Sequence, residues 1–216
     1  MMRTMPSRCV IGLVVGLLSG SVLAHDPIFG IGPHVLYKGG VEISPDVFLA
    51  EAGDQSATRT ALNVTYGITG DWAAGIELPY VRLDDGVARN SGRADIRLFT
   101  KYRFWRQDSL GAQESAAVFL KVKLDSADDS GGSGVGTGTT DAILGLTYGF
   151  EGRKWYRWAS IRYRLNGTND SGLQRGDKLL FDLVGGIRFN PTGYLQADTV
   201  WLLELNGEYG SRADFN

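Results

Sequence analysis

From residue 58 onward, the sequence falls into runs of about ten residues in which apolar and polar side chains alternate. In the clearest run, residues 94–104, the apolar side chains of Ile96, Leu98 and Tyr102 fall on one face. Arg97 and Lys101 fall on the opposite face. A strand whose two faces meet different surroundings requires this period of two, so the pattern predicts β-structure with one apolar and one charged face.

Nine strands are predicted in this way. Eight follow the alternation, at residues 62–68, 74–80, 94–104, 116–124, 142–150, 159–165, 179–189 and 195–209. The ninth is an irregular first strand within residues 34–49, which we expect Pro45 to interrupt. Glycine makes up 30 of the 216 residues, about twice its usual share, as many tight turns between strands require.

Residues 1–24 have the layout of a secretory signal peptide. Arg3 and Arg8 give the positive start, residues 10–18 are apolar, and small residues precede Ala24. The predicted mature chain therefore begins at His25, and residues 25–216 form one domain. No later segment approaches the roughly 18 consecutive apolar residues of a membrane-spanning helix, so a helical membrane protein is excluded.

The lengths of the strands and of their connections favour an outer-membrane barrel, which has short turns at one end and long loops at the other. The links predicted to be long are residues 51–57, 82–93, 125–138 and 166–176. The short ones are residues 69–71, 151–154 and 190–193, and residues 105–114 are intermediate. A soluble periplasmic β-barrel that binds a ligand is the alternative, since it shows the same alternation.

In a membrane barrel, the polar face lines the lumen. The predicted lumen-lining residues are Glu77, Asp95, Arg97, Lys101, Arg103, Lys121, Lys123, Asp141, Arg162, Arg164, Asp182, Arg188, Asp198, Glu204 and Glu208. The bases lie mainly on the middle strands and the acids on the last two. Either the two groups set an electric field across an open bore, or they pair across it and fill it.

The composition excludes several classes of function. The net charge is −2, and loss of the two arginines of the signal peptide makes it −4, so nucleic acid is not an expected partner. The only cysteine, Cys9, lies in the signal peptide, and the two histidines, His25 and His34, precede the confident strands. We therefore expect no enzyme, no catalytic residue and no cofactor. The metal hypothesis that we retain is copper, chelated by the amine and imidazole of His25 with His34 or Asp26 as a further ligand.

Four segments resemble the family of outer-membrane transporters labelled MetA-pathway of phenol degradation. They are residues 25–40 (HDPIFGIGPHVLYKGG), 66–80 (YGITGDWAAGIELPY), 92–103 (GRADIRLFTKYR) and 203–209 (LELNGEY). The resemblance implies an outer-membrane location and a transport role, and it brings no catalytic residues.

The prediction is thus an all-β, up-and-down antiparallel transmembrane β-barrel exported to the outer membrane. Its partners would be outer-membrane lipid and a small solute, such as an aromatic compound taken up passively. A plugged structural or heavy-metal-associated envelope barrel is the other membrane-bound alternative. Because single-chain bacterial barrels have even strand numbers, nine strands lead us to expect a full barrel of 10 to 12, with the rest beyond residue 216.

Overall fold

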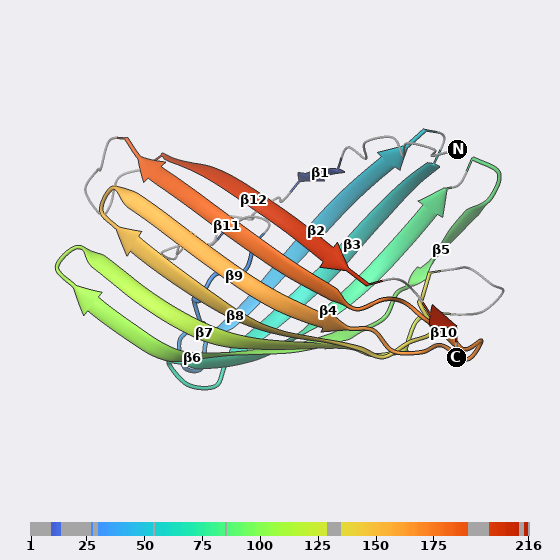
Figure 1. The fold of residues 1–216 in the computed structure, drawn as a ribbon, viewed down its shortest axis with the longest axis horizontal. Helices are drawn as coiled ribbons and strands as arrows, with labels where there is room; N and C mark the ends of the chain where they lie inside the picture. The colour runs from blue at the N-terminus through green and yellow to red at the C-terminus, as the bar shows by residue number, and fades with distance from the viewer. Residues whose placement is uncertain are drawn as a thin grey trace.

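Nine long antiparallel strands form one curved sheet in the computed structural model, which describes residues 10–13, 27, 30–53, 55–84, 86–128, 135–189, 199–211 and 214–215. Each strand has 11 to 13 residues and pairs with the next long strand along the chain. The strands are β2 (Val41–Ala52), β3 (Gln55–Gly67), β4 (Trp72–Asp84), β6 (Arg97–Ser109), β7 (Ala112–Lys123), β8 (Asp141–Gly152), β9 (Trp155–Leu165), β11 (Lys178–Arg188) and β12 (Val200–Gly210). The sheet bends through an arc of 239° (Figure 1). This up-and-down half-barrel confirms the predicted fold class and the number of strands.

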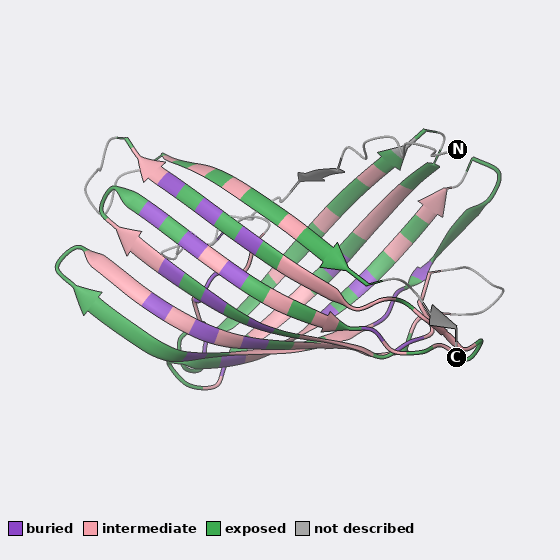
Figure 2. Ribbon diagram, in the orientation of Figure 1, coloured by how far each residue is buried: buried purple, intermediate pink, exposed green. Residues whose placement is uncertain are grey.

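Successive residues along the strands alternate between burial and exposure, as the sequence predicted (Figure 2). On β8, Leu144 and Leu146 are exposed on the convex side, whereas Thr147 is 4% exposed on the concave side. On β12, Leu203 on the convex side is 80% exposed. The convex face is therefore an apolar surface without protein over it, and the polar side chains gather inside the curve.

The first long strand is regular, and the prediction that Pro45 interrupts it is wrong. β2 keeps an unbroken register with β3 from Val41 opposite Tyr66 to Ala52 opposite Gln55, with Pro45 opposite Leu62. On its other side, β2 is paired only over Val47 to Ala50, by the short β1 (Val10–Leu13). Proline lacks a backbone N–H, and the missing donor is tolerated because Pro45 lies on an edge of the sheet.

The links differ in length between the two ends of the sheet. At one end they comprise residues 68–71, 110–111 and 153–154, and we call this the short-link end. At the other end, residues 124–140 join β7 to β8, and the remaining long links contain β5 (Arg89–Arg93) and β10 (Leu173–Gln174). Two link predictions are wrong: residues 51–57 reduce to the pair 53–54, and residues 105–114 to 110–111. The predicted link at residues 190–193 lies outside the described residues.

The extra residues of those two predicted links belong to strands. Arg106, Gln107 and Asp108 extend β6 and pair with β7 although they are polar. Backbone pairing continues past the point where the side-chain alternation stops, because the ladder requires only N–H and C=O groups.

The two outer edges of the sheet are not joined to each other. In the described chain, β12 pairs with β11 alone, and the short β13 (Asp214–Phe215) pairs with β10. β1 belongs to the predicted signal peptide, so cleavage after Ala24 would expose the edge of β2. Further strands beyond residue 216 stay a prediction.

The described ranges contain no helix, and hence none long and apolar enough to cross a membrane.

A substitution in the β6–β7 turn tests the fold. Gly111 has a backbone φ of +78°. A residue with a Cβ adopts this left-handed conformation at a cost of about 1 to 2 kcal/mol. We expect Gly111→Ala to lower the midpoint of thermal unfolding, measured by circular dichroism. Gly185→Ala is the control, because an added Cβ there meets no atom within 4 Å. Equal midpoints for the two variants would contradict the turn geometry.

Candidate functional site

A segment that precedes the first long strand crosses the concave face of the sheet. We call residues 30–40 the strap. Lys101 on β6 holds it with two hydrogen bonds, from Nζ to the carbonyl oxygens of Gly32 at 2.8 Å and His34 at 3.0 Å. The Thr147 hydroxyl on β8 donates to the carbonyl of Ile31 at 2.6 Å. These contacts fix the backbone of the strap, so they depend little on which side chains it carries.

The start of the strap lies against the last two strands. The Gly30 amide donates to Oε2 of Glu204 on β12 at 3.2 Å. A Cβ at Gly30 would approach the Asp182 side chain on β11 to 3.3 Å. Pro33 is fully buried and lies beside Gly149 of β8. The strap thus reaches from β12 across β8 to β6, through the hollow of the half-barrel.

The strap ends beside β3 and leads directly into β2. The Gly39 amide donates to the carbonyl of Gly67 at 2.7 Å, and the Gly67 amide donates to the carbonyl of Gly40 at 2.9 Å. A Cβ at Gly67 would lie 2.0 Å from the carbonyl oxygen of Tyr37, so only glycine allows this approach. The strap is therefore tied at both ends to the wall of the half-barrel, towards the short-link end.

A cluster of basic side chains surrounds one carboxylate on the concave face. Glu77 of β4 is 4% exposed and forms ion pairs with Arg59 of β3 and Arg97 of β6. Its other oxygen lies 3.1 Å from Nζ of Lys121 on β7. Three cations on one carboxylate leave this part of the wall positively charged, in a place where burial weakens screening by water.

The basic cluster continues onto β9. Arg162 is ion-paired with Asp182 of β11 at 2.6 Å, and the Ser160 hydroxyl donates to the same carboxylate. The Arg164 side chain has no hydrogen bond and no ion pair within the described chain, and Arg97 and Arg162 act on it as neighbouring charges. We call Arg59, Arg97, Lys121, Arg162 and Arg164 the basic cluster. Along β6, Lys101 follows Arg97 towards the short-link end, so the cluster lies on the long-link side of the strap.

Two glycines give the large side chains of this wall room to lie flat. A Cβ at Gly75 would come within 2.4 Å of the Phe99 ring, and one at Gly145 within 2.6 Å of Arg162. Phe99 and Arg162 therefore lie against the sheet instead of projecting across the hollow. Glycine within a strand often marks a place where another group lies close to the backbone. Because these two side chains lie against the sheet, they leave space inside the curve.

Asp95 organises the long link 124–140 instead of presenting its charge to a solute. It is 3% exposed and accepts hydrogen bonds from the backbone amides of Ser126, Ala127 and Thr137. Lys123 lies 3.1 Å from it. Asp95 thereby holds the two described parts of the link, residues 124–128 and 135–140, close to one carboxylate.

The other predicted lumen residues lie on the same concave face but have structural partners. Lys123 also reaches Asp141 at 3.2 Å, and Arg103 binds Asp71 in the β3–β4 turn at 2.7 Å. Lys178 pairs with Glu208 at 2.8 Å, and Arg188 lies over the Tyr156 ring at 5.3 Å. Asp198 lies outside the described residues.

The ion pairs follow the wall and do not cross the hollow. Arg162 with Asp182 and Lys178 with Glu208 join adjacent strands, and the cations on Glu77 come from β3, β6 and β7, all near β4. These pairs follow the wall, and the choice between the two predicted arrangements of the lumen stays a prediction.

Of the two histidines predicted to bind copper, His34 lies within the described residues and His25 does not. His34 Nε2 lies 2.7 Å from Oε1 of Glu151 on β8, so the imidazole is engaged with the wall. His25 lies outside the described residues, which contain no group of three or more His, Cys, Asp or Glu placed to hold a metal ion. Copper binding at the mature amino terminus stays a prediction.

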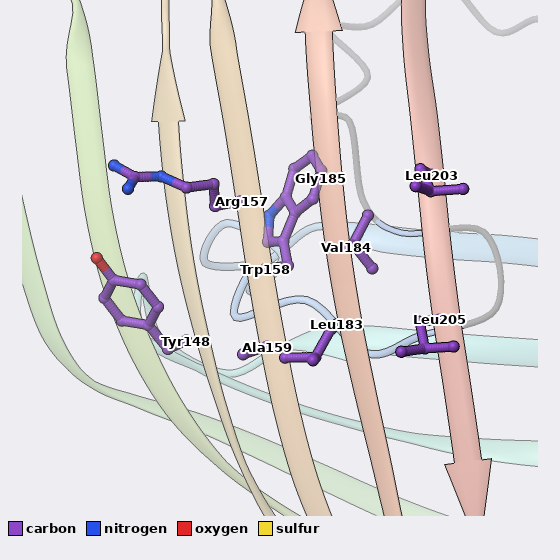
Figure 3. Close-up of a pocket in the computed structure, with 9 residues that line it drawn as sticks. All are labelled: Tyr148, Arg157, Trp158, Ala159, Leu183, Val184, Gly185, Leu203 and Leu205. Carbon is purple, nitrogen blue, oxygen red and sulfur yellow. The ribbon is translucent and has the colours of Figure 1, made fainter.

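A separate hollow lies on the convex face (Figure 3). Gly185 leaves a gap there between Leu183, Leu203 and Leu205, with Ala159 and Tyr148 at its border. The side chains of these leucines are exposed and apolar. This hollow opens away from the strap and the basic cluster, so it is a feature of the outer surface and not part of the lumen.

Two features of the site escaped the sequence analysis. The strap has no alternation that could signal it, and its contacts run mostly through backbone carbonyls. Arg59 was missed because the predicted strand began at residue 62. Extending the same period of two back from Asn63 and Ala61 places Arg59 on the polar face.

An up-and-down half-barrel with an apolar outside, a charged inside and an internal strap defines a protein of the β-barrel class. The chain belongs to the family described as "Putative MetA-pathway of phenol degradation", whose sequence model matches residues 25–212. This confirms the resemblance found in the sequence. Comparison with the curated proteins and with the solved structures gave no match.

The role of Asp95 can be tested by hydrogen exchange. We expect Asp95→Asn to accelerate exchange of the amides of Ser126, Ala127 and Thr137, because a neutral amide oxygen is a weaker acceptor than a carboxylate. Glu208→Gln is the control, since Glu208 pairs only locally with Lys178 in the described chain. Unchanged exchange in Asp95→Asn would show that the link does not depend on this carboxylate.

Proposed function

We propose that the protein is an outer-membrane β-barrel channel for the passive uptake of small solutes. The observation that carries the proposal is the division of one sheet into an exposed apolar face and a charged concave face. An apolar surface of this extent is stable only against lipid or another protein surface. The family's link to phenol degradation favours aromatic solutes.

The dimensions of the sheet support a membrane location. The nine long strands have 11 to 13 residues, and a tilted membrane strand needs about 9 to 11. Three of the four links of two to four residues lie at one end, and three of the four longer links lie at the other, as is typical of outer-membrane barrels. The exceptions are residues 53–54 and 189–199. In the orientation that we propose, the short-link end of the sheet faces the periplasm. The predicted signal peptide would direct export of the chain.

Passive transport fits the chemistry of the concave face better than catalysis does. Most of its charged groups are held in ion pairs along the wall, and the histidine of the strap, His34, is engaged with Glu151. A general acid or base must be able to exchange protons with a substrate. We therefore propose that the protein is not an enzyme and that no cofactor takes part.

The strap makes a plugged envelope barrel the second candidate. It is bonded to the wall through Lys101, Thr147 and Glu204, and it lies across the hollow that a solute would have to pass. A channel requires the strap to move aside or to leave a path beside it. A plug requires that it stay in place.

Two arginine substitutions on β11 test the membrane location. Leu183 points outwards and is 53% exposed, so we expect Leu183→Arg to cost about 2 to 4 kcal/mol near the middle of the bilayer. Leu180→Arg is the matched control, because Leu180 faces inwards opposite Glu208. The measurement is the fraction of protein that folds into lipid vesicles. Equal folded fractions would argue against a lipid-facing convex side.

Conductance in planar bilayers tests the channel itself. We expect the wild-type protein to conduct, and Lys101→Met to raise the open probability about tenfold, because it removes two charge-assisted bonds to the strap. Lys178→Met is the control, since Lys178 pairs with Glu208 on β12 and forms no bond to the strap among the described residues. Silence of both the wild type and Lys101→Met would favour the plugged barrel over the channel.

A further inference from the structure

We propose that the basic cluster is a binding site for small aromatic carboxylates inside the lumen. This inference rests on the proposed channel and names the class of solute that the channel would take. The site would hold the carboxylate on Lys121, Arg162 and Arg164, and the ring against Phe99 and Phe119.

The charge balance of the cluster favours an anion. Its five cations are opposed by two carboxylates in direct contact, Glu77 and Asp182. Asp46 acts on Arg59 and Lys121 from a greater distance and already accepts a hydrogen bond from the Asn63 amide at 2.6 Å. Asp95, Asp141 and Glu208 act on Arg97 or Arg164 in the same way, and they are themselves paired with Lys123 and Lys178. With all of these counted, seven positive charges face six negative ones, which leaves an excess of one.

The cluster also has donors without acceptors. The Nε atoms of Arg59 and Arg162 are buried, and neither has a hydrogen-bond partner among the described residues. Arg164 lies between the longer-range attractions of Asp141 and Glu208 and is bonded to neither. A buried donor left unpaired costs about 1 to 3 kcal/mol, and more when it is charged. Arg164 is only partly buried, so an oxyanion brought into the lumen would supply an acceptor to its guanidinium group.

Aromatic rings lie next to the same charges. Nζ of Lys121 is 5.7 Å from the centre of the Phe99 ring and 5.8 Å from that of Phe119. Phe99 lies flat over Gly75, and Phe119 is 6% exposed. A ligand ring placed against Phe99 would have its carboxylate beside Lys121. Rings contribute offset or edge-to-face contacts, so a ligand that joins a ring to an anion satisfies both parts of the wall.

The basic cluster lies between the long-link end of the sheet and the strap. It lies on the long-link side of the strap, which the proposed orientation places towards the outside of the cell. The strap, held by Lys101 and Thr147, closes the space towards the short-link end. A solute that enters from outside therefore meets the basic cluster before it meets the strap.

Calorimetric titration of the detergent-solubilised protein tests this site without needing conductance. The probes are benzoate, its neutral analogue benzamide, and acetate, which carries the charge without the ring. We expect benzoate to bind saturably, and benzamide and acetate to bind at least about tenfold more weakly, because each lacks one of the two kinds of contact.

The variants are Lys121→Gln and Arg164→Gln, with Arg157→Gln as the control on the convex face. We expect each cluster variant to weaken benzoate binding about tenfold and the control to leave it unchanged. Far-ultraviolet circular dichroism verifies that each variant is folded. Equal binding of benzoate and benzamide, or equal loss in the cluster variants and the control, would overturn the site.

The outcomes separate this site from the channel. Conductance without any preference for benzoate would leave the channel standing and reject the site. Benzoate binding by a protein that never conducts would keep the site and reject the channel. If acetate binds as well as benzoate does, the site is a general anion site and the aromatic part of the proposal is wrong.

Discussion

The ladder of backbone hydrogen bonds, which has a β-bulge between Arg103 and Trp105, is the constraint on which the rest of the structure depends. From β3 to β11, each long strand is paired on both sides, so its amides and carbonyls are satisfied within the sheet. In lipid, each unpaired backbone group costs several kcal/mol. Because the ladder also fixes the pleat, it decides which side chains face outwards. The apolar exterior and the charged interior are thus two results of one register.

The charged interior is stable because its ions are solvated by one another and by the backbone. Glu77 would be costly to bury alone, but three cations surround it. Lys101 is held by two carbonyls of the strap. Such networks lose much of their stability if a single member is removed, since the remaining charges stay buried without compensation. The ion pairs therefore hold the charged side chains of the wall in place. The basic cluster still carries more cations than carboxylates in direct contact with them.

The alternation of side chains was enough to predict eight of the nine long strands, whereas the first was placed only as an irregular strand within residues 34–49. The ends of the strands were not predictable in the same way. Arg106 and Asp108 pair through their backbones, and nothing in their side chains signals it. The strap was missed for a related reason: its place depends on distant partners such as Lys101, Thr147 and Glu204. A periodic pattern describes neighbours within a strand and says little about contacts across the curve.

The strap passes into β2 through the turn at Gly39 and Gly40, so it can leave the wall but not the molecule. A short covalent link keeps a detached segment at an effective local concentration on the order of millimolar. Any solute inside the lumen would then compete with a permanent internal ligand. In the proposed channel, occupancy of the lumen would follow mass action between the two, so flow would rise with the external concentration of the solute.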